Sequence, residues 1–118
     1  MRNNIQAVNL LEVGCQMMRN VLFMYPDTAQ EAAPVVATII NAMQDNINAV
    51  TFQKEACNLL WMLVMEEESC QSKILALDGL GILMRVMEAN REDSELQKAA
   101  LGAFNRLSFV TRGEEGAN

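Results

Sequence analysis

The chain has 118 residues, of which 51% are hydrophobic and 20% charged, so it is long enough for one domain with a core and too apolar to be disordered. Its 15 acidic and nine basic residues give a net charge of −6, which disfavours nucleic acids and anionic membranes as partners. Histidine is absent, which removes Ser–His and Cys–His catalytic pairs and most zinc sites. We expect no enzyme, metal or cofactor; an enzyme that uses the Glu66–Glu68 carboxylates is the alternative of that class.

The predicted elements are all helices. Aromatic residues make up only 5% of the chain, which contains nine methionines, and this composition favours helices over strands. The first predicted element is a long helix within residues 1–24. The longest apolar run, Leu59 to Met65, is far too short to span a membrane.

A second group of helices covers residues 27–65. A short helix opens at Pro26, and helices over 35–44 and 48–65 follow it. A proline inside a continuous helix would cost about 3 kcal/mol, so Pro34 predicts the start of a helix.

A third group with the same plan covers residues 69–109. Ser69 is a predicted N-cap for a short helix, and Asp78–Gly79 predicts a sharp turn into a second helix. Ser94 is the predicted N-cap of a third helix, and Gln97 stands three residues later, as in a capping box.

These groups repeat one another in sequence. Phe52-Gln53-Lys54 aligns with Leu96-Gln97-Lys98, 44 residues later, and the alignment continues without a gap. The first helix aligns 42 residues ahead of the second group, with Gly14-Cys15 over Ala56-Cys57. A period of roughly 40–47 residues is typical of solenoids built from two or three helices per repeat.

The pattern resembles the armadillo repeat, which has a short helix, a glycine turn, a second helix and a long third helix. The residues that carry the resemblance are Ile74, Asp78-Gly79-Leu80, Leu83, Gln97, Ala100, Ala103, Asn105 and Leu107. The resemblance implies an all-α, armadillo-like right-handed α-solenoid whose third helices line a concave groove. It also implies a non-catalytic protein that binds extended peptides or folded partners. The two-helix HEAT repeat is the alternative fold, but the bends at Pro34 and Gly79 favour armadillo.

On this basis the chain is a single armadillo-like domain over residues 1–112. It comprises a partial repeat (1–24) and two repeats (27–65 and 69–109). The polar, glycine-containing segment 113–118 is expected to be a disordered tail.

The candidate partner-binding groove follows from the third helices. Lys54, Asn58, Met62 and Met65 share one helix side, with Trp61 adjacent, and the flanking helices supply equivalent positions. The candidate residues are Gln16, Arg19, Asn20, Lys54, Asn58, Trp61, Met62, Met65, Asn105 and Arg106. The alternative for Trp61 is a core position between neighbouring repeats.

Cysteines and glycines add structural expectations. Cys15 and Cys57 occupy the same repeat position, and leucine stands there in the last repeat, so both are predicted core residues. The odd number of three cysteines does not suggest disulfides, and we expect a cytoplasmic protein, with the nucleus as the alternative compartment. Gly14 and Gly102 fall inside predicted third helices, where close helix approach between repeats would explain them.

The predicted function is therefore a non-enzymatic interaction module with a protein or peptide partner. The acidic run Glu66–Glu68 could recruit a basic segment of that partner, or it could be a solvated linker. One alternative is an assembly module that forms homo-oligomers through exposed apolar repeat ends, and another is a fragment of a longer armadillo array. The apolar residues expected at the ends are Ile5, Val8, Leu11, Val13, Leu107, Phe109 and Val110.

Overall fold

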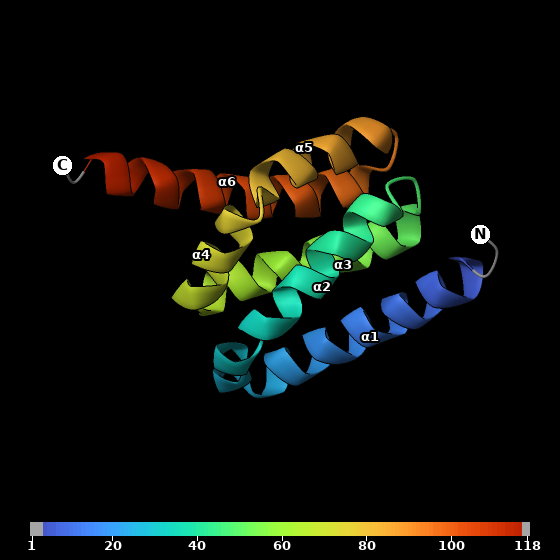
Figure 1. The fold of residues 1–118 in the computed structure, drawn as a ribbon, viewed down its shortest axis with the longest axis horizontal. Coiled ribbons are helices and arrows are strands. Elements are labelled where there is room, and N and C mark those ends of the chain that lie inside the picture. The colour runs from blue at the N-terminus through green and yellow to red at the C-terminus, as the bar shows by residue number, and fades with distance from the viewer. Residues whose placement is uncertain (1–3, 117–118) are drawn as a thin grey trace.

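The computed structural model describes the backbone of residues 4–116 and the side chains of residues 7–111, and this part of the chain contains no strand. Its elements in chain order are α1 (Asn4–Met24), the 3-10 helix η1 (Pro26–Glu31), α2 (Ala33–Asp45), α3 (Val50–Glu66), α4 (Glu68–Ala76), α5 (Gly79–Ala89) and α6 (Ser94–Gly116) (Figure 1). The all-α prediction is confirmed. None of the described helices is long and apolar enough to cross a bilayer.

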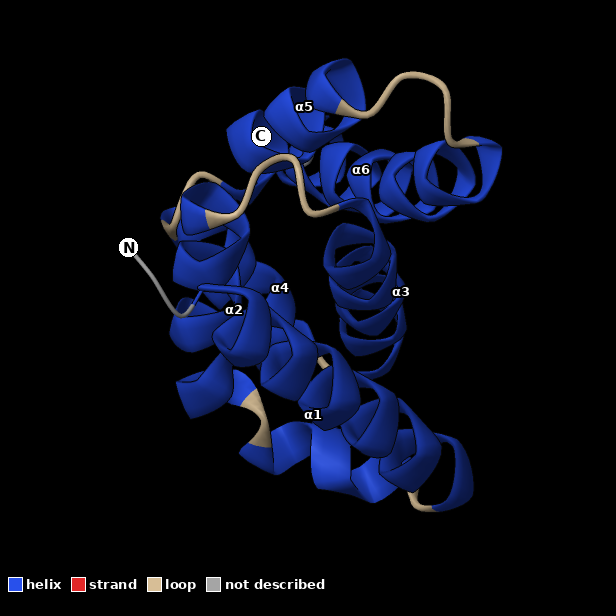
Figure 2. Cartoon of the chain, turned by 90° about the vertical axis from the view of Figure 1, so that its right-hand side faces the viewer, coloured by secondary structure: helices blue, strands red, loops and turns tan. Residues whose placement is uncertain are grey.

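The helices lie in two layers. Helices α1, α3 and α6 form one layer with α3 in the middle, and α3 makes its most extensive contacts with the other two (Figure 2). Helices α2 and α5 contact each other and pack against α3 and α6 respectively, while η1 and α4 form the corners that lead into them (Figure 1). The three long helices therefore present one continuous row of side chains.

The core lies between these layers. Buried residues of α3 recur in α6 at a spacing of 44 residues, as Phe52 with Leu96 and Ala56 with Ala100, all fully buried. Burying each large apolar side chain contributes roughly 1.5–3 kcal/mol, so this shared set holds the two long helices together.

A buried glutamine joins α3 to the end of α2. Gln53 Nε2 donates to the carbonyl oxygens of Met43 and Asn46 at 2.9 and 2.8 Å, and the residue is fully buried. Asn46 Nδ2 in turn donates to the carbonyl oxygen of Ala42 at 2.9 Å. The last carbonyls of α2, which have no partner within the helix, are satisfied in this way. We call the glutamine–asparagine pair and its acceptors an amide clamp.

The same bonds recur 44 residues later. Gln97 Nε2 donates to the carbonyl oxygens of Met87 and Asn90 at 2.9 and 2.8 Å. Asn90 Nδ2 donates to the carbonyl oxygen of Val86 at 2.8 Å and also to that of Ile47 at 2.9 Å. The last bond ties this second amide clamp to the loop that carries the first.

The predicted capping box at the start of α6 is wrong. Asp93, one residue before the predicted cap Ser94, accepts a hydrogen bond from the backbone N–H of Leu96 at 2.9 Å. Aspartate is as good an N-cap as serine, and Asp93 is the residue that caps α6. Gln97 does not reach back to the cap because its amide is used by the second amide clamp.

The other predicted breaks have mixed outcomes. Pro34 lies in the first turn of α2, and the chain turns at Asp78–Gly79, so both predictions are confirmed. Asp78 has a left-handed backbone with φ of 61°, and its carboxylate accepts from the N–H of Gly81. Ser69 is not an N-cap, because α4 begins at Glu68 and the Ser69 hydroxyl donates to Glu67.

The segment after residue 112 was assigned to a tail. Helix α6 continues to Gly116 and so enters that segment, whose side chains are not among those described, and residues 117–118 lie outside the described residues. The division into a domain and a tail stays a prediction.

Candidate interaction surface

The ten predicted groove residues all lie on α1, α3 and α6, the layer of three stacked helices. None of them is fully buried. Most of the polar ones, however, already have partners within the chain, and these contacts decide which groups remain available.

A carboxylate bridges α1 and α3. Glu55 Oε1 lies 2.7 Å from Arg19 Nη2, and Glu55 Oε2 accepts a hydrogen bond from Gln16 Nε2 at 3.3 Å. The side chains of Arg19 and Glu55 are only 31% and 17% exposed, so this pair is better shielded than a typical surface ion pair. Arg19 and Gln16 therefore hold the layer together at this point.

A lysine bridges α3 and α6. Lys54 Nζ lies 3.5 Å from both Asp93 Oδ2 and Glu95 Oε1. The Asp93 carboxylate raises the pKa of Lys54 above its usual value. The pKa of Asp93 is lowered, first by the hydrogen bond from the Leu96 N–H and further by Lys54. Lys54 thus acts as a cross-link at the N-terminal end of the row.

The apolar candidates gather at the other end of α3. Trp61 is half-buried and packs directly against Gly102, where an added Cβ would lie 2.5 Å from the indole ring. Trp61, Met62, Met65 and Glu66 line an open hollow of about 300 Å³, which we call the Trp61 hollow. Trp61 therefore fills the space between α3 and α6 and also forms part of an exposed surface. Its packing against Gly102 is that expected for the alternative of a position between repeats, and its role in partner binding stays a prediction.

The remaining polar candidates differ in availability. Asn20 and Asn105 are exposed, whereas the Asn58 side chain is half-buried and donates to the carbonyl oxygen of Lys54 at 3.1 Å, within its own helix. Arg106 is half-buried, and its Nε has no hydrogen-bond partner among the described residues. A buried donor of this kind is costly unless something pairs with it. Nε of Arg19 is also buried without a hydrogen-bond partner among the described residues, so the surface has two arginines with an unused donor, and of these only Arg106 has no ion pair there.

Several residues of this surface were not predicted. Glu55, the central acceptor between α1 and α3, has no counterpart in the repeat alignment, since valine and alanine stand at the equivalent positions. Leu101 and Phe109 on α6 are 49% and 61% exposed. Phe109 was predicted only as an apolar residue at the end of the array. It stands seven residues, or about two helical turns, after Gly102, and this spacing indicates that it lies on the same side of α6 as Gly102.

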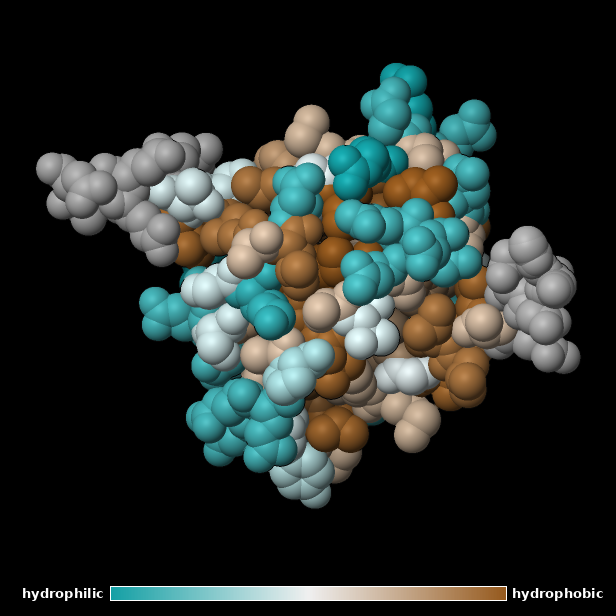
Figure 3. All heavy atoms as spheres, in the orientation of Figure 1, coloured by the Kyte–Doolittle hydropathy of each residue, from teal (hydrophilic) through white to brown (hydrophobic). Residues whose placement is uncertain are grey.

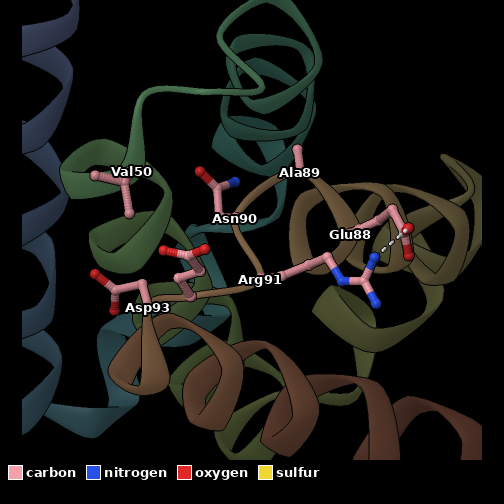
Figure 4. Close-up of a pocket in the computed structure, with 7 residues that line it drawn as sticks. Val50, Glu88, Ala89, Asn90, Arg91 and Asp93 are labelled. Atoms are coloured by element: carbon pink, nitrogen blue, oxygen red, sulfur yellow. Dashed lines mark hydrogen bonds and ion pairs between the residues drawn. The ribbon is translucent and has the colours of Figure 1, made fainter.

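A larger hollow of about 500 Å³ lies at the loop between α5 and α6, lined by Val50 and residues 88–93 (Figure 4). Most of its polar groups are engaged within the chain; the exception is the exposed Glu92, which has no partner among the described residues. Asn90 belongs to the second amide clamp, Asp93 caps α6 and pairs with Lys54, and Arg91 lies 3.5 Å from Glu88 (Figure 4). The hollow therefore offers a ligand few free donors or acceptors.

The three cysteines are buried, as predicted for Cys15 and Cys57. Burial raises the pKa of Cys15 to about 11 and that of Cys57 to about 12. The pKa of Cys70 is also raised, first by burial and then by Glu67, so the helix N-terminus does not activate this thiol. A reactive thiolate is not favoured at any of these positions.

Comparison of the chain with protein-family models, with curated proteins and with solved structures gave no significant match.

Proposed function

We propose that this chain is a non-enzymatic protein-interaction module with an armadillo-like solenoid architecture, acting in the cytoplasm. Two observations support the architecture. The amide clamps recur at the 44-residue spacing of the sequence repeat, and the three helices assigned to the ends of the repeats pack side by side. Solenoid proteins use such rows of equivalent helices as extended binding surfaces.

The binding surface is the row formed by α1, α3 and α6, and its working part is the region around the Trp61 hollow. One observation carries this proposal: Arg106, whose Nε has no hydrogen-bond partner among the described residues, lies one helical turn from Gly102, which packs against Trp61, and Trp61 lines a hollow together with two methionines. Methionine-lined surfaces adapt to varied apolar side chains, and tryptophan and arginine are the residues most often found at the energetic centre of interfaces.

The proposed partner is an extended protein segment. An apolar side chain of that segment would enter the Trp61 hollow, and a main-chain carbonyl oxygen would accept from Arg106. Glu66 on the rim of the hollow would pair with a basic residue of the segment.

The test is selection from a displayed library of random linear peptides, followed by affinity measurements on the purified chain. Met65→Ala and Arg106→Ala should each weaken binding of the selected peptides about tenfold, equivalent to about 1.4 kcal/mol. Arg85→Ala, on the exposed side of α5, is the matched control and should leave the affinity unchanged. If no peptide is enriched, or if Arg85→Ala weakens binding and the other two variants do not, the proposed surface is wrong.

Asn58→Ala is a milder variant of the same surface. Its amide donates only to a carbonyl of its own helix, so we expect weaker peptide binding with unchanged thermal unfolding. A loss of several kcal/mol in stability with intact binding would place Asn58 in the structure and not in the site.

A specific observation also favours the alternative function, assembly through the repeat ends: large apolar side chains are exposed along α1.

A further inference from the structure

Helix α1 exposes a stripe of apolar side chains. Leu10, Val13, Met17, Val21 and Met24 are 73%, 49%, 60%, 46% and 67% exposed, and their spacing puts them on one side of the helix. We call this set the α1 stripe. Brown and tan side chains mark this region along the lower right of the molecule in Figure 3, where α1 lies in Figure 1.

Three members of the α1 stripe, Leu10, Met17 and Val21, occupy positions that are fully buried in the other two long helices, whereas Val13 and Met24 align with Glu55 and Glu66 of α3, which are not buried. Met17 aligns with Leu59 and Ala103, which are both fully buried. The residues aligned with Leu10 and Val21 are fully buried too; they are Phe52, Leu96, Leu63 and Leu107. The sequence therefore gives α1 the same core-forming face as α3 and α6, but no described part of the chain covers it.

Gly14 gives a second, independent observation. An added Cβ at Gly79, Gly81 or Gly102 would collide with a neighbouring side chain, which explains each of those glycines. At Gly14, inside α1, nothing lies within 4 Å of an added Cβ. Glycine in a helix interior is destabilising relative to alanine, and no contact within the described chain compensates for it here. The close approach of a helix from another molecule would compensate for this cost.

The stripe carries no charged side chain, although the whole chain has a net charge of −6. Arg19, one turn away, is already paired with Glu55. A carboxylate does lie beside the stripe, because the exposed Glu31 lines the hollow next to Met17 and Val21, but the stripe itself offers none to a basic partner. Two copies of the stripe can therefore meet without bringing like charges of the stripe together.

We propose that the α1 stripe is covered by the α1 stripe of a second copy of this chain, in an antiparallel, two-fold symmetric pair. When Gly14 of one copy faces Met17 of the other, Leu10 faces Val21 and Ala7 faces Met24. Each large side chain then lies against a smaller one, and Gly14 lets the two helices approach closely at the centre.

An apolar hollow beside the stripe completes this fit. It has a volume of about 300 Å³ and lies between α1 and the η1–α2 corner, lined in part by Met17, Val21 and Val35. In the proposed register Leu10 of the second copy lies over Val21, at the edge of this hollow. Leu10 is the most exposed member of the stripe, and burying it there removes that apolar surface from water.

The test begins with absolute mass from light scattering over a concentration series of the full chain. We expect a transition from 13.1 kDa to twice this mass, with no larger species. Met17→Glu should weaken dimerisation at least 100-fold, because it would bury two negative charges, one from each copy, in the apolar interface. Met84→Glu is the matched control, since Met84 is a similarly exposed methionine (57%) on α5, and it should leave the dimer intact.

Gly14→Leu and disulfide trapping test the register itself. Leucine at position 14 meets open space in the single chain, so the monomer should unfold at an equal or higher temperature while the dimer is lost. A mixture of Gly14→Cys and Met17→Cys chains should form a disulfide-linked heterodimer on mild oxidation. A mixture of Gly14→Cys and Met84→Cys chains should not.

A chain that stays at 13.1 kDa at every concentration overturns the proposal. An association that resists Met17→Glu and is abolished by Met84→Glu also overturns the proposal, because the interface would then lie around Met84 on α5.

Discussion

Helices α1 and α3 carry the same apolar pattern and differ in what lies against them. Helix α3 has α1 on one side and α6 on the other, and Phe52, Leu59 and Leu63 are fully buried. The equivalent residues of α1 are Leu10, Met17 and Val21, and they are 73%, 60% and 46% exposed. An apolar stripe at helical spacing therefore shows which face of a helix needs cover. Whether that face is covered depends on the neighbours.

The largest test of this comparison is the pair Phe52→Ala and Leu10→Ala. Truncating the fully buried phenylalanine removes its contacts and leaves a cavity, so the free energy of unfolding should fall by about 3–5 kcal/mol. Truncating Leu10 should change it by less than about 0.5 kcal/mol, because this side chain is 73% exposed. Chemical denaturation followed by circular dichroism, at a concentration where the chain is monomeric, measures both.

A loss of several kcal/mol for Leu10→Ala under these conditions would mean that the stripe packs within its own chain, and the comparison of α1 with α3 would fail.

The amide clamps provide the next largest effect. Gln53→Ala leaves the carbonyl of Met43 without its donor in a fully buried site, and we expect a loss of about 2–3 kcal/mol. Gln97→Ala should cost about 1 kcal/mol, since Gln97 is partly exposed and water can replace part of its hydrogen bonding. The equivalent residue of α1 is Leu11, which cannot form a clamp.

Thermal unfolding of the two glutamine variants, with Gln44→Ala as an exposed control, compares the clamps. Equal losses for Gln53→Ala and Gln97→Ala would show that burial does not set their strength.

The two helix glycines should respond with opposite signs. In Gly102→Ala the new Cβ would lie 2.5 Å from the Trp61 ring, and the overpacking should lower the free energy of unfolding by about 1–3 kcal/mol. In Gly14→Ala the new Cβ meets open space, and the better helix propensity should raise it by up to about 1 kcal/mol in the monomer. Destabilisation by both substitutions would place a neighbour of the same chain against Gly14.

The parts of the fold that were predictable from sequence depend on local rules. Pro34 fixes a helix start through its own ring. At the Asp78–Gly79 turn, Asp78 takes the left-handed conformation and Gly79 leaves room for Ile74. The all-α class follows from composition. The repeat alignment correctly placed Cys15 and Cys57 in the core, although Leu101 at the same repeat position is 49% exposed.

The parts that were missed depend on contacts between segments far apart in the sequence. The capping box at Ser94 is a local exception: Asp93 caps α6, and the Gln97 amide donates to carbonyls seven and ten residues earlier and not to the cap. The role of Glu55 depends on Arg19, which lies 36 residues away on another helix. Leu11 was expected among the exposed apolar residues of the repeat end, but it packs against the core, and its neighbour Leu10 is the exposed residue. Apolar periodicity alone does not show which of two adjacent leucines faces the rest of the chain.

Cys15 and Cys57 provide the finest test, because they are the same repeat position in α1 and α3. Cys57 is fully buried, and burial raises its pKa to about 12. Cys15 is 5% exposed, and its pKa is raised to about 11, first by burial and then by the charge of Glu55. Both values exceed 9.0, the ordinary value, so the folded state holds these protons more tightly than the unfolded state. Stability from this source is complete below pH 9 and is lost as the pH rises through 11 and 12.

Cys15 has the lower pKa of the two and is slightly exposed, so at pH 8 iodoacetamide should alkylate Cys15 faster than Cys57. Peptide mass spectrometry after timed quenching measures the two rates in one sample, and the Cys57→Ala variant confirms the assignment. Equal rates would mean that both thiols react only when the whole chain unfolds. Helix α1 would then be as resistant to local opening as α3, although the α1 stripe is exposed. The exposed stripe would lower the free energy of unfolding less than the comparison of α1 with α3 implies.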